Sequence, residues 1–156
     1  MAKYLVTGGA GFIGSNLTDE LIKEGHEVVV LDNLSTGKKE NVNPKAKFVK
    51  ADITNFEEIK PHFSGVNGVF HTAALPRVQL SIEKPAETNE VNVRGTLNVL
   101  IAAKDAGVKK FVYSSSSSIY GNAETIPVKE SFKPAPVSPY GLQKYVGEEY
   151  TRVFAE

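Results

Sequence analysis

The sequence Val6-Thr7-Gly8-Gly9-Ala10-Gly11-Phe12-Ile13-Gly14 decides the fold expected for this chain. It follows a short apolar run, Tyr4-Leu5-Val6, and leads into apolar residues that recur at helical spacing as far as Ile22. The order is therefore strand, glycine turn and helix. The glycines fit G-x-G-x-x-G from Gly9 and G-x-x-G-x-x-G from Gly8. Such a turn lets a pyrophosphate approach the backbone at a helix N-terminus, so the stretch predicts dinucleotide binding.

An acidic residue stands where a dinucleotide-binding turn requires one, which disfavours the alternative of an ordinary glycine-rich turn. The first helix should end near Glu24-Gly25, and Glu27-Val28-Val29-Val30-Leu31 is typical of a buried parallel strand. Asp32 closes that strand, 18 residues after Gly14. A carboxylate there accepts hydrogen bonds from ribose hydroxyls and repels a 2′-phosphate, which favours NAD over NADP. Lys38 and Lys39 are the argument for NADP, and a solvated loop is the preferred interpretation of both.

The composition indicates a single domain, residues 1–156, and excludes several classes of protein. The 18 basic and 18 acidic residues cancel, so we expect neither a nucleic-acid partner nor a membrane partner. The absence of cysteine excludes disulfides and thiolate metal sites, and no metal site is expected. No apolar run approaches the length of a membrane span, and no signal peptide is recognisable. A cytoplasmic protein is the expectation.

The rest of the chain alternates strands with helices. Residues 47–50, 65–71 and 110–113 are predicted strands, and a long helix should run from Pro85 to Ala106-Gly107. This alternation predicts an α/β fold, a doubly wound parallel sheet of the Rossmann type with strand order 3-2-1-4-5. Ligand should lie at the carboxyl ends of the strands, near the point where the strand order reverses.

Three short segments at strand ends suggest further positions for a cofactor. The loop Asn33-Leu34-Ser35-Thr36-Gly37 is polar and carries a turn signal. Asp52 is placed to meet an adenine edge or to cap the helix that follows, and the two roles are compatible. The small residues of Thr72-Ala73-Ala74 would let a cofactor lie against the backbone, whereas His71 is expected to be a packed residue without chemistry.

The last helix carries the candidate chemistry. Ser138 is a good N-cap and Pro139 suits the first helical position. Tyr140 and Lys144 are four residues apart and share a helix face. An ammonium near a phenol lowers the phenol pKa from about 10, and such a tyrosine can act as general base toward a sugar hydroxyl. Y-x-x-x-K alone is a common surface spacing, but here a nucleotide-binding turn and the serines at 114–118 precede it.

Seven motifs in order resemble the extended short-chain dehydrogenase/reductase family, and within it the UDP-glucose 4-epimerase branch. They are residues 7–14, Asp32-Asn33-Leu34-Ser35, Asp52-Ile53, His71-Thr72-Ala73-Ala74, Asn92-Val93-Arg94-Gly95-Thr96, Ser114-Ser115-Ser116 with Tyr120-Gly121, and Ser138-Pro139-Tyr140-Gly141 with Lys144.

The resemblance implies NAD as cofactor and UDP-sugar as substrate. It places the NAD pyrophosphate at Gly8, Gly11, Phe12, Ile13 and Gly14, and the adenosine ribose at Asp32 and Asn33, with Ser35, Thr36 and Gly37 also binding cofactor. It places adenine at Asp52 and Ile53, and the cofactor channel along Ala73, Ala74 and Asn92.

The resemblance also implies the reaction. Tyr140 would remove the proton of the sugar O4 while hydride passes from C4 to NAD⁺, and the 4-keto sugar would turn over before hydride returns to its other face. Lys144 would bind the nicotinamide ribose and tune Tyr140. Ser116 would be the hydroxyl partner, with Ser118 the next choice.

Two segments separate branches of the family. Nucleotide-sugar dehydratases carry acidic residues before the Tyr-Gly pair, whereas this chain has Ser116-Ser117-Ser118-Ile119-Tyr120-Gly121, which argues against a dehydratase. Residues 74–78 and the serine run resemble epimerases of N-acetylated UDP-hexoses. Many UDP-glucose epimerases have a lysine where Pro76 stands, and the nearest cation here is Arg77.

Family members are about twice as long, so we expect an N-terminal half without the C-terminal substrate domain. The choice of UDP-sugar is left open. The alternatives are a non-catalytic NAD-binding module, or a related NAD-dependent sugar-nucleotide decarboxylase or reductase. The family often forms homodimers, which implies a homodimer through the helices after Pro85 and Pro139.

Overall fold

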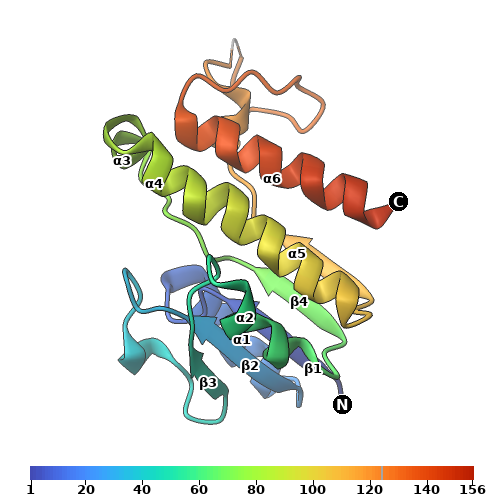
Figure 1. The fold of residues 1–156 in the computed structure, drawn as a ribbon. Helices are drawn as coiled ribbons and strands as arrows, with labels where there is room; N and C mark the ends of the chain where they lie inside the picture. Colours follow the sequence, from blue (N-terminus) through green and yellow to red (C-terminus); the bar gives the residue numbers. More distant parts are fainter. Residues whose placement is uncertain (124) are drawn as a thin grey trace.

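The computed structural model describes residues 1–123 and 125–156 and has a five-stranded parallel sheet at its centre (Figure 1). The strands lie in the order β3-β2-β1-β4-β5, and every neighbouring pair is parallel. Their bounds are Lys3–Thr7 for β1, Glu27–Asp32 for β2, Lys47–Lys50 for β3, Gly68–His71 for β4 and Lys110–Tyr113 for β5. The predicted Rossmann topology is confirmed, and its switch point lies between β1 and β4.

The central strand β1 and its two neighbours, β2 and β4, hold the buried residues of the sheet. Leu5 and Val6 of β1 are fully buried, and Val6 lies in register with Val30 of β2 and Phe70 of β4. Burial on both faces is what continuous apolar runs in a parallel sheet require. The edge strand β5 is more open, and Val112 is 51% exposed.

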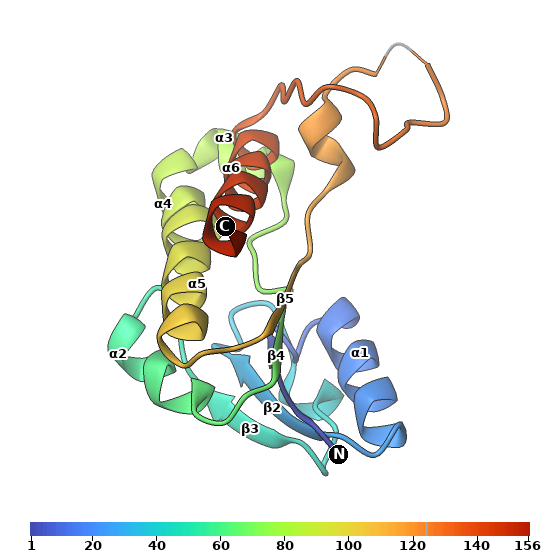
Figure 2. The same ribbon diagram turned by 90° about the vertical axis from the view of Figure 1, so that its right-hand side faces the viewer.

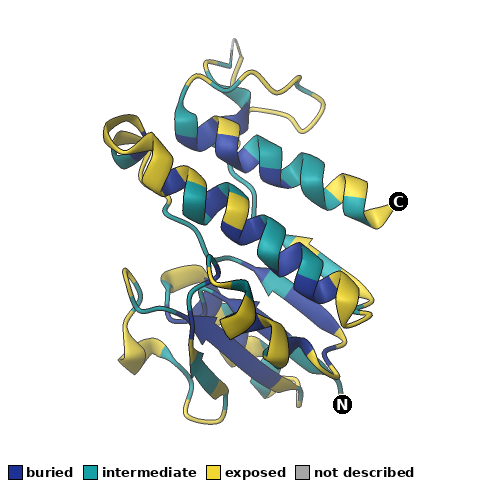
Figure 3. Cartoon of the chain, in the orientation of Figure 1, coloured by how far each residue is buried: buried dark blue, intermediate teal, exposed yellow. Residues whose placement is uncertain are grey.

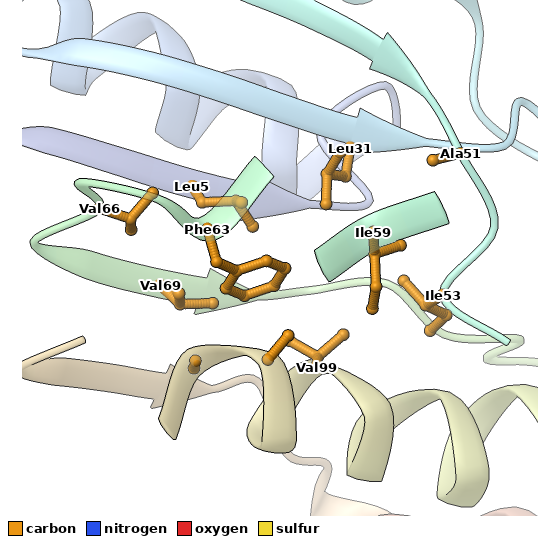
Figure 4. Close-up of a cluster of buried hydrophobic side chains, with 11 residues drawn as sticks. Leu5, Leu31, Ala51, Ile53, Ile59, Phe63, Val66, Val69 and Val99 are labelled. Carbon is orange, nitrogen blue, oxygen red and sulfur yellow. The ribbon is translucent and has the colours of Figure 1, made fainter. Parts of the chain in front are cut away.

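Helices cover both faces of the sheet (Figure 2). On one face, α1 (Phe12–Lys23) packs Leu17 and Leu21 against Val28 and Val30. On the other face lie α2 (Phe56–Ile59), the 3₁₀ turn η2 (Lys60–Phe63) and α5 (Thr96–Asp105). The larger apolar cluster forms there and includes Leu5, Leu31, Ile59, Phe63 and Val99 (Figure 4). The sheet is buried between these layers, whereas the outer helix faces are exposed (Figure 3).

The long helix predicted from Pro85 is present, but it is not a regular α-helix throughout. It consists of α4 (Pro85–Asn89), the π-helical segment η3 (Glu90–Gly95) and α5. A Cβ on Gly95 would lie 2.7 Å from the Ile53 side chain, so this segment packs tightly on the loop after β3. The helix ends as predicted, because Gly107 adopts φ 70° just beyond its last turn.

The last helix, α6 (Pro139–Ala155), begins as predicted. The Ser138 hydroxyl oxygen accepts a hydrogen bond from the Gly141 N–H at 3.1 Å, and Pro139 is the first helical residue. α6 lies beside α4 and α5 in both views (Figures 1 and 2). The remaining short elements are η1 (Lys39–Asn41), α3 (Val78–Glu83) and η4 (Ser117–Tyr120). Among the described residues, no helix is both long enough and apolar enough to cross a membrane.

Candidate functional site

A cavity of about 590 Å³ opens at the carboxyl ends of the strands and brings most of the predicted residues together. Those that line it are Gly8, Gly11, Phe12, Ile13, Gly14, Asp32, Asn33, Ser35, Thr36, Ile53, Ala73, Ala74, Tyr140 and Lys144. The glycine turn and the candidate catalytic helix therefore face the same space. Gly37, Asp52, Asn92 and Ser116 are not among its lining residues.

The glycine turn is packed so closely that side chains are excluded from it. Gly8 has φ 70°, and a Cβ there would lie 2.7 Å from the Ala73 backbone nitrogen. A Cβ on Gly14 would collide with the Gly8 carbonyl oxygen. The N-cap of α1, Gly11, offers no side-chain hydrogen bond, so the first N–H groups of α1 remain available. This cradle of free donors at a helix N-terminus suits a pyrophosphate.

Asp32 connects the glycine turn to the loop after β2. Its Oδ2 accepts a hydrogen bond from the Ala10 N–H at 3.0 Å, and its Oδ1 accepts one from the Leu34 N–H at 2.8 Å. Leu34 adopts φ 62°, which is unusual for a branched side chain. Each carboxylate oxygen keeps a free lone pair, so Asp32 can still accept a ribose hydroxyl. Gly37 packs against Ala10 in the same corner, and a Cβ added at Gly37 would lie 2.8 Å from the Ala10 backbone.

The prediction that Asp52 caps the next helix is wrong. The N-cap of α2 is Asn55, and Asp52 instead accepts hydrogen bonds from the Thr54 N–H at 2.9 Å and from the Thr54 hydroxyl at 2.7 Å. Its other oxygen accepts a hydrogen bond from Asn33 Nδ2 at 2.8 Å. Burial raises the pKa of Asp52, but the hydrogen bonds from Thr54 and Asn33 outweigh it, so the pKa lies below its usual value. Asp52 thus fixes Asn33 at the cavity edge.

Tyr140 and Lys144 lie on the face of α6 that is turned to the cavity, and both are buried, at 8% and 3% exposure. The Tyr140 N–H donates a hydrogen bond to the Ser81 hydroxyl at 3.0 Å, which fixes the start of α6 to α3. Burial lowers the pKa of Lys144 to about 8, and the nearby Glu148 carboxylate partly opposes this change. At neutral pH Lys144 is therefore charged but poorly solvated.

The serine run divides between the cavity and the turn that follows it. Ser114 and Ser115 line the cavity, whereas Ser116 is the N-cap of η4. The Ser116 hydroxyl oxygen accepts a hydrogen bond from the Ser118 N–H at 3.2 Å. A hydroxyl that accepts in this way still has its proton to donate.

His71 is a packed residue, as predicted, and it stands in a buried chain of hydrogen bonds. Its Nδ1 lies 2.6 Å from the Thr7 hydroxyl, and its Nε2 lies 2.9 Å from the Thr96 hydroxyl. The Thr96 hydroxyl donates to the Asn92 carbonyl at 2.7 Å, so it must accept the Nε2 proton of His71. Burial, and then the charge of Lys144, lower the pKa of His71 to about 3. The imidazole is therefore neutral at pH 7.

The series of buried hydrogen bonds continues from Thr96 through Asn92 and Gln143, two side chains whose contact could not be predicted from the sequence. Asn92 accepts a hydrogen bond from the Leu75 N–H at 2.8 Å and donates to the Leu75 carbonyl at 3.1 Å. It also donates to Gln143 Oε1 at 2.8 Å, and Gln143 donates to the Thr88 hydroxyl at 3.0 Å. Asn92 thus ties the cavity wall at Leu75 to the helix that carries Tyr140.

Comparison with known proteins places the chain in one family. The family model described as "NAD dependent epimerase/dehydratase family" matches residues 4–156. The chain belongs to this family. The UDP-glucose 4-epimerase of Streptomyces lividans is 43% identical over 145 residues, which cover 91% of this chain and 44% of that protein.

Solved structures of this epimerase/dehydratase family superpose closely on the chain. The UDP-glucose 4-epimerase of Thermotoga maritima, solved with UDP-glucose, has a TM-score of 0.95 and 43% identity, covering 98% of this chain and 51% of that one. The Thermus thermophilus UDP-glucose 4-epimerase, solved in complex with NAD, has a TM-score of 0.93 and 41% identity, covering 98% and 50%. The chain thus spans about half the length of these relatives.

The cavity has further lining residues that were not expected to bind a ligand: Leu31, Ala51, Leu75, Pro76, Glu87, Val91, Ser114 and Ser115. Thr72 lines the cavity, as expected of the segment Thr72-Ala73-Ala74. Ser114 directly follows β5, so its position at the carboxyl end of the sheet could also have been inferred. Glu87 and Val91 belong to the long helix that begins at Pro85, which was predicted from its apolar spacing and without a role in binding. Within the described residues, no three acidic, histidine or cysteine side chains gather to hold a metal.

Proposed function

We propose that the protein is an NAD-dependent 4-epimerase of a UDP-hexose, and that this chain is its cofactor-binding half. The observation that carries the proposal is one cavity lined both by the glycine turn and by Tyr140 and Lys144. Membership of the NAD-dependent epimerase/dehydratase family and the names of the relatives support it.

The residues of the cavity suit NAD. The free N–H groups at the start of α1 and the excluded side chains at Gly8 and Gly14 would hold the pyrophosphate. Asp32 would accept hydrogen bonds from the adenosine ribose, and Asn33, held by Asp52, would lie beside it. The small residues Ala73 and Ala74, together with Ile53, Ser35 and Thr36, would line the rest of the cofactor. When bound, NAD supplies a hydride acceptor for the sugar C4 and returns the hydride.

The proton chemistry would fall to α6. Tyr140 would take the proton of the sugar O4 and return it after the sugar has turned over. Lys144, charged at neutral pH and buried beside the phenol, would favour the phenolate through its field and would hydrogen-bond the nicotinamide ribose. Ser116 would donate its free proton to the same sugar oxygen, and Ser115 and Ser114 form the wall before it.

A homodimer is part of the proposal. A second, apolar groove of about 360 Å³ lies between α4–η3 and α6 and is lined by Pro85, Asn89, Val93, Pro139, Leu142, Gln143 and Val146. Leu142 is 53% exposed on this outer face. A pair of helices from a second copy would cover it and form a four-helix contact.

The test uses the full-length protein with UDP-galactose and, separately, UDP-N-acetylgalactosamine. We expect wild type to interconvert one of these with its 4-epimer at unchanged mass, and Tyr140→Phe to lose at least a hundredfold in kcat. Tyr150→Phe, a tyrosine on the same helix outside the cavity lining, is the matched control. An unchanged rate in Tyr140→Phe would contradict the assigned base, and a product whose mass differs from that of the substrate would contradict epimerisation.

Cofactor binding is tested separately by calorimetry with NAD⁺. Asp32→Ala should weaken binding by about tenfold, the loss expected for one or two hydrogen bonds to a charged group. Asp19→Ala, on the outer surface of α1, should bind as wild type does. Equal affinity of the Asp32→Ala variant and the wild type would overturn the ribose assignment.

A further inference from the structure

Within the part of the chain that the structure describes, Lys144 is a buried cation without a carboxylate partner. It is 3% exposed, and none of the five ion pairs among the described residues includes it, since all five lie on the surface. Glu148, one turn farther along α6, favours the charged form only at longer range. An unpaired ammonium in such a place requires another source of stabilisation.

The ring of Tyr113 lies directly beneath this ammonium. Lys144 Nζ is 4.3 Å from the centroid of the Tyr113 ring, well within the range of a cation–π contact. Tyr113 is the last residue of β5, so the contact joins the sheet to α6 at the cavity. This role of Tyr113 could not be predicted from the sequence, because nothing in a strand pattern indicates which ring a distant lysine will cover.

The position of the Tyr113 ring is tightly determined by its surroundings. A Cβ on Gly147, three residues after Lys144, would collide with the Tyr113 hydroxyl oxygen, so α6 lies against the edge of the ring. The His71 ring packs with its centroid 5.7 Å from that of Tyr113. Within the described residues the Tyr113 hydroxyl has no hydrogen-bond partner, so the face of the ring, and not its hydroxyl, makes the polar contact.

We propose that Tyr113 is a positioning residue that holds the Lys144 ammonium at the cavity through the face of its ring and favours the charged form. Its consequence for catalysis rests on the proposed function, in which a charged Lys144 activates Tyr140. The groups that face Lys144 fit this role: among the described residues Glu148 is the carboxylate that acts on it, and His71 is neutral. Burial raises the pKa of Tyr113 well above its ordinary value, so its phenol stays neutral and does not compete with Tyr140 as a base.

The direct test measures the titration of Lys144 in the full-length protein and needs no turnover. Lysine labelled with ¹³C at Cε gives one signal per residue, and Lys144→Met identifies the signal of Lys144. Tyr113→Phe keeps the ring and should leave the titration unchanged. Pentafluorophenylalanine at position 113 keeps the shape but reverses the ring quadrupole, and should increase the ratio of neutral to charged amine roughly tenfold at a given pH.

Equal titration in the phenylalanine and pentafluorophenylalanine proteins would overturn the proposal, because it would show that Tyr113 only fills space. Tyr113→Leu is a second test: if this variant folds and Lys144 keeps its titration, the ring is again irrelevant. If the full-length protein epimerises UDP-hexoses, the alkaline limb of its kcat profile should lie at lower pH with pentafluorophenylalanine at position 113 than in wild type, and should stay in place in Tyr113→Phe. Absence of turnover would refute the proposed function, and the lysine titration would still decide the role of Tyr113.

Discussion

Lys144→Met should stabilise the protein while removing a group assigned to catalysis. Methionine matches lysine in length, lacks the charge and is a good helix former, so the change mainly removes a buried ammonium from α6. Lys144 is 3% exposed and has a pKa of about 8 in the folded chain, against 10.5 in water.

The magnitude follows from this difference in pKa. At about 1.36 kcal/mol per pKa unit, burial of the charged form costs about 3 kcal/mol, in full at any pH below about 8. The contact with Tyr113 offsets about 0.5–2 kcal/mol of this cost and is lost in the variant. The net gain at pH 7 should therefore be about 1–3 kcal/mol. Because the folded state loses its proton first, wild type becomes more stable as pH rises from 8 to 10.5, and the advantage of the variant shrinks over that window.

The assay is urea denaturation of wild type and variant at several pH values between about 6 and 10.5, with Lys104→Met as control. Lys104 is exposed on α5, and its replacement should change the free energy of unfolding by no more than about 0.5 kcal/mol. If Lys144→Met destabilised the protein by the same amount at every pH, the buried charge would not be the costly element and the reasoning would fail.

Three further predictions concern the same region. His71, with a pKa of about 3 in the fold against 6.5 in water, should remove up to about 5 kcal/mol of stability as pH falls from 6.5 to 3, and His71→Gln should show a correspondingly flatter acid slope in urea denaturation; equal slopes would contradict this. Gln143→Leu leaves Asn92 and Thr88 with unpaired polar atoms and should cost about 1–3 kcal/mol in the same assay, whereas exposed Gln79→Leu should cost less than about 0.5. Gly14→Ala should lower the thermal midpoint, at a cost of about 1–3 kcal/mol, because its Cβ collides with backbone, and Gly11→Ala, whose Cβ would have its nearest neighbour at 3.2 Å, should do so less; the reverse ranking would refute the packing argument.

The parts of the fold predicted from sequence are those with a local signature. Strands over residues 47–50 and 110–113 were predicted with their observed bounds, because short β-branched and aromatic runs between turn signals have few other interpretations. The glycine spacing and the position of Asp32 located the switch point of the sheet, and the Ser138-Pro139 pair located the start of α6. Each of these features depends on one short stretch of consecutive residues.

The parts that could not be predicted depend on contacts between distant residues. Asn92 was expected along the cofactor channel, but its side chain is committed to Leu75 and to Gln143, which lies 51 residues away. The π-helical segment that holds Asn92 has no sequence signature separate from that of the α-helix on either side. Asp52 looked like a helix cap because a helix follows it, but its carboxylate accepts hydrogen bonds from Thr54 and Asn33, and α2 begins only at Phe56 with Asn55 as its N-cap.

His71 and Lys144 are similarly buried in the corner formed by β4, β5 and α6, yet they differ in charge. Burial lowers both pKa values, but the histidine starts at 6.5 and the lysine at 10.5, so at pH 7 the imidazole is neutral and the ammonium remains charged. The result is a single cation in a region poor in water, where its field acts more strongly than it would at the surface. The proximity of its pKa to neutrality also makes Lys144 sensitive to its surroundings, so a change in the ring of Tyr113 should shift the pH range in which Lys144 loses its charge.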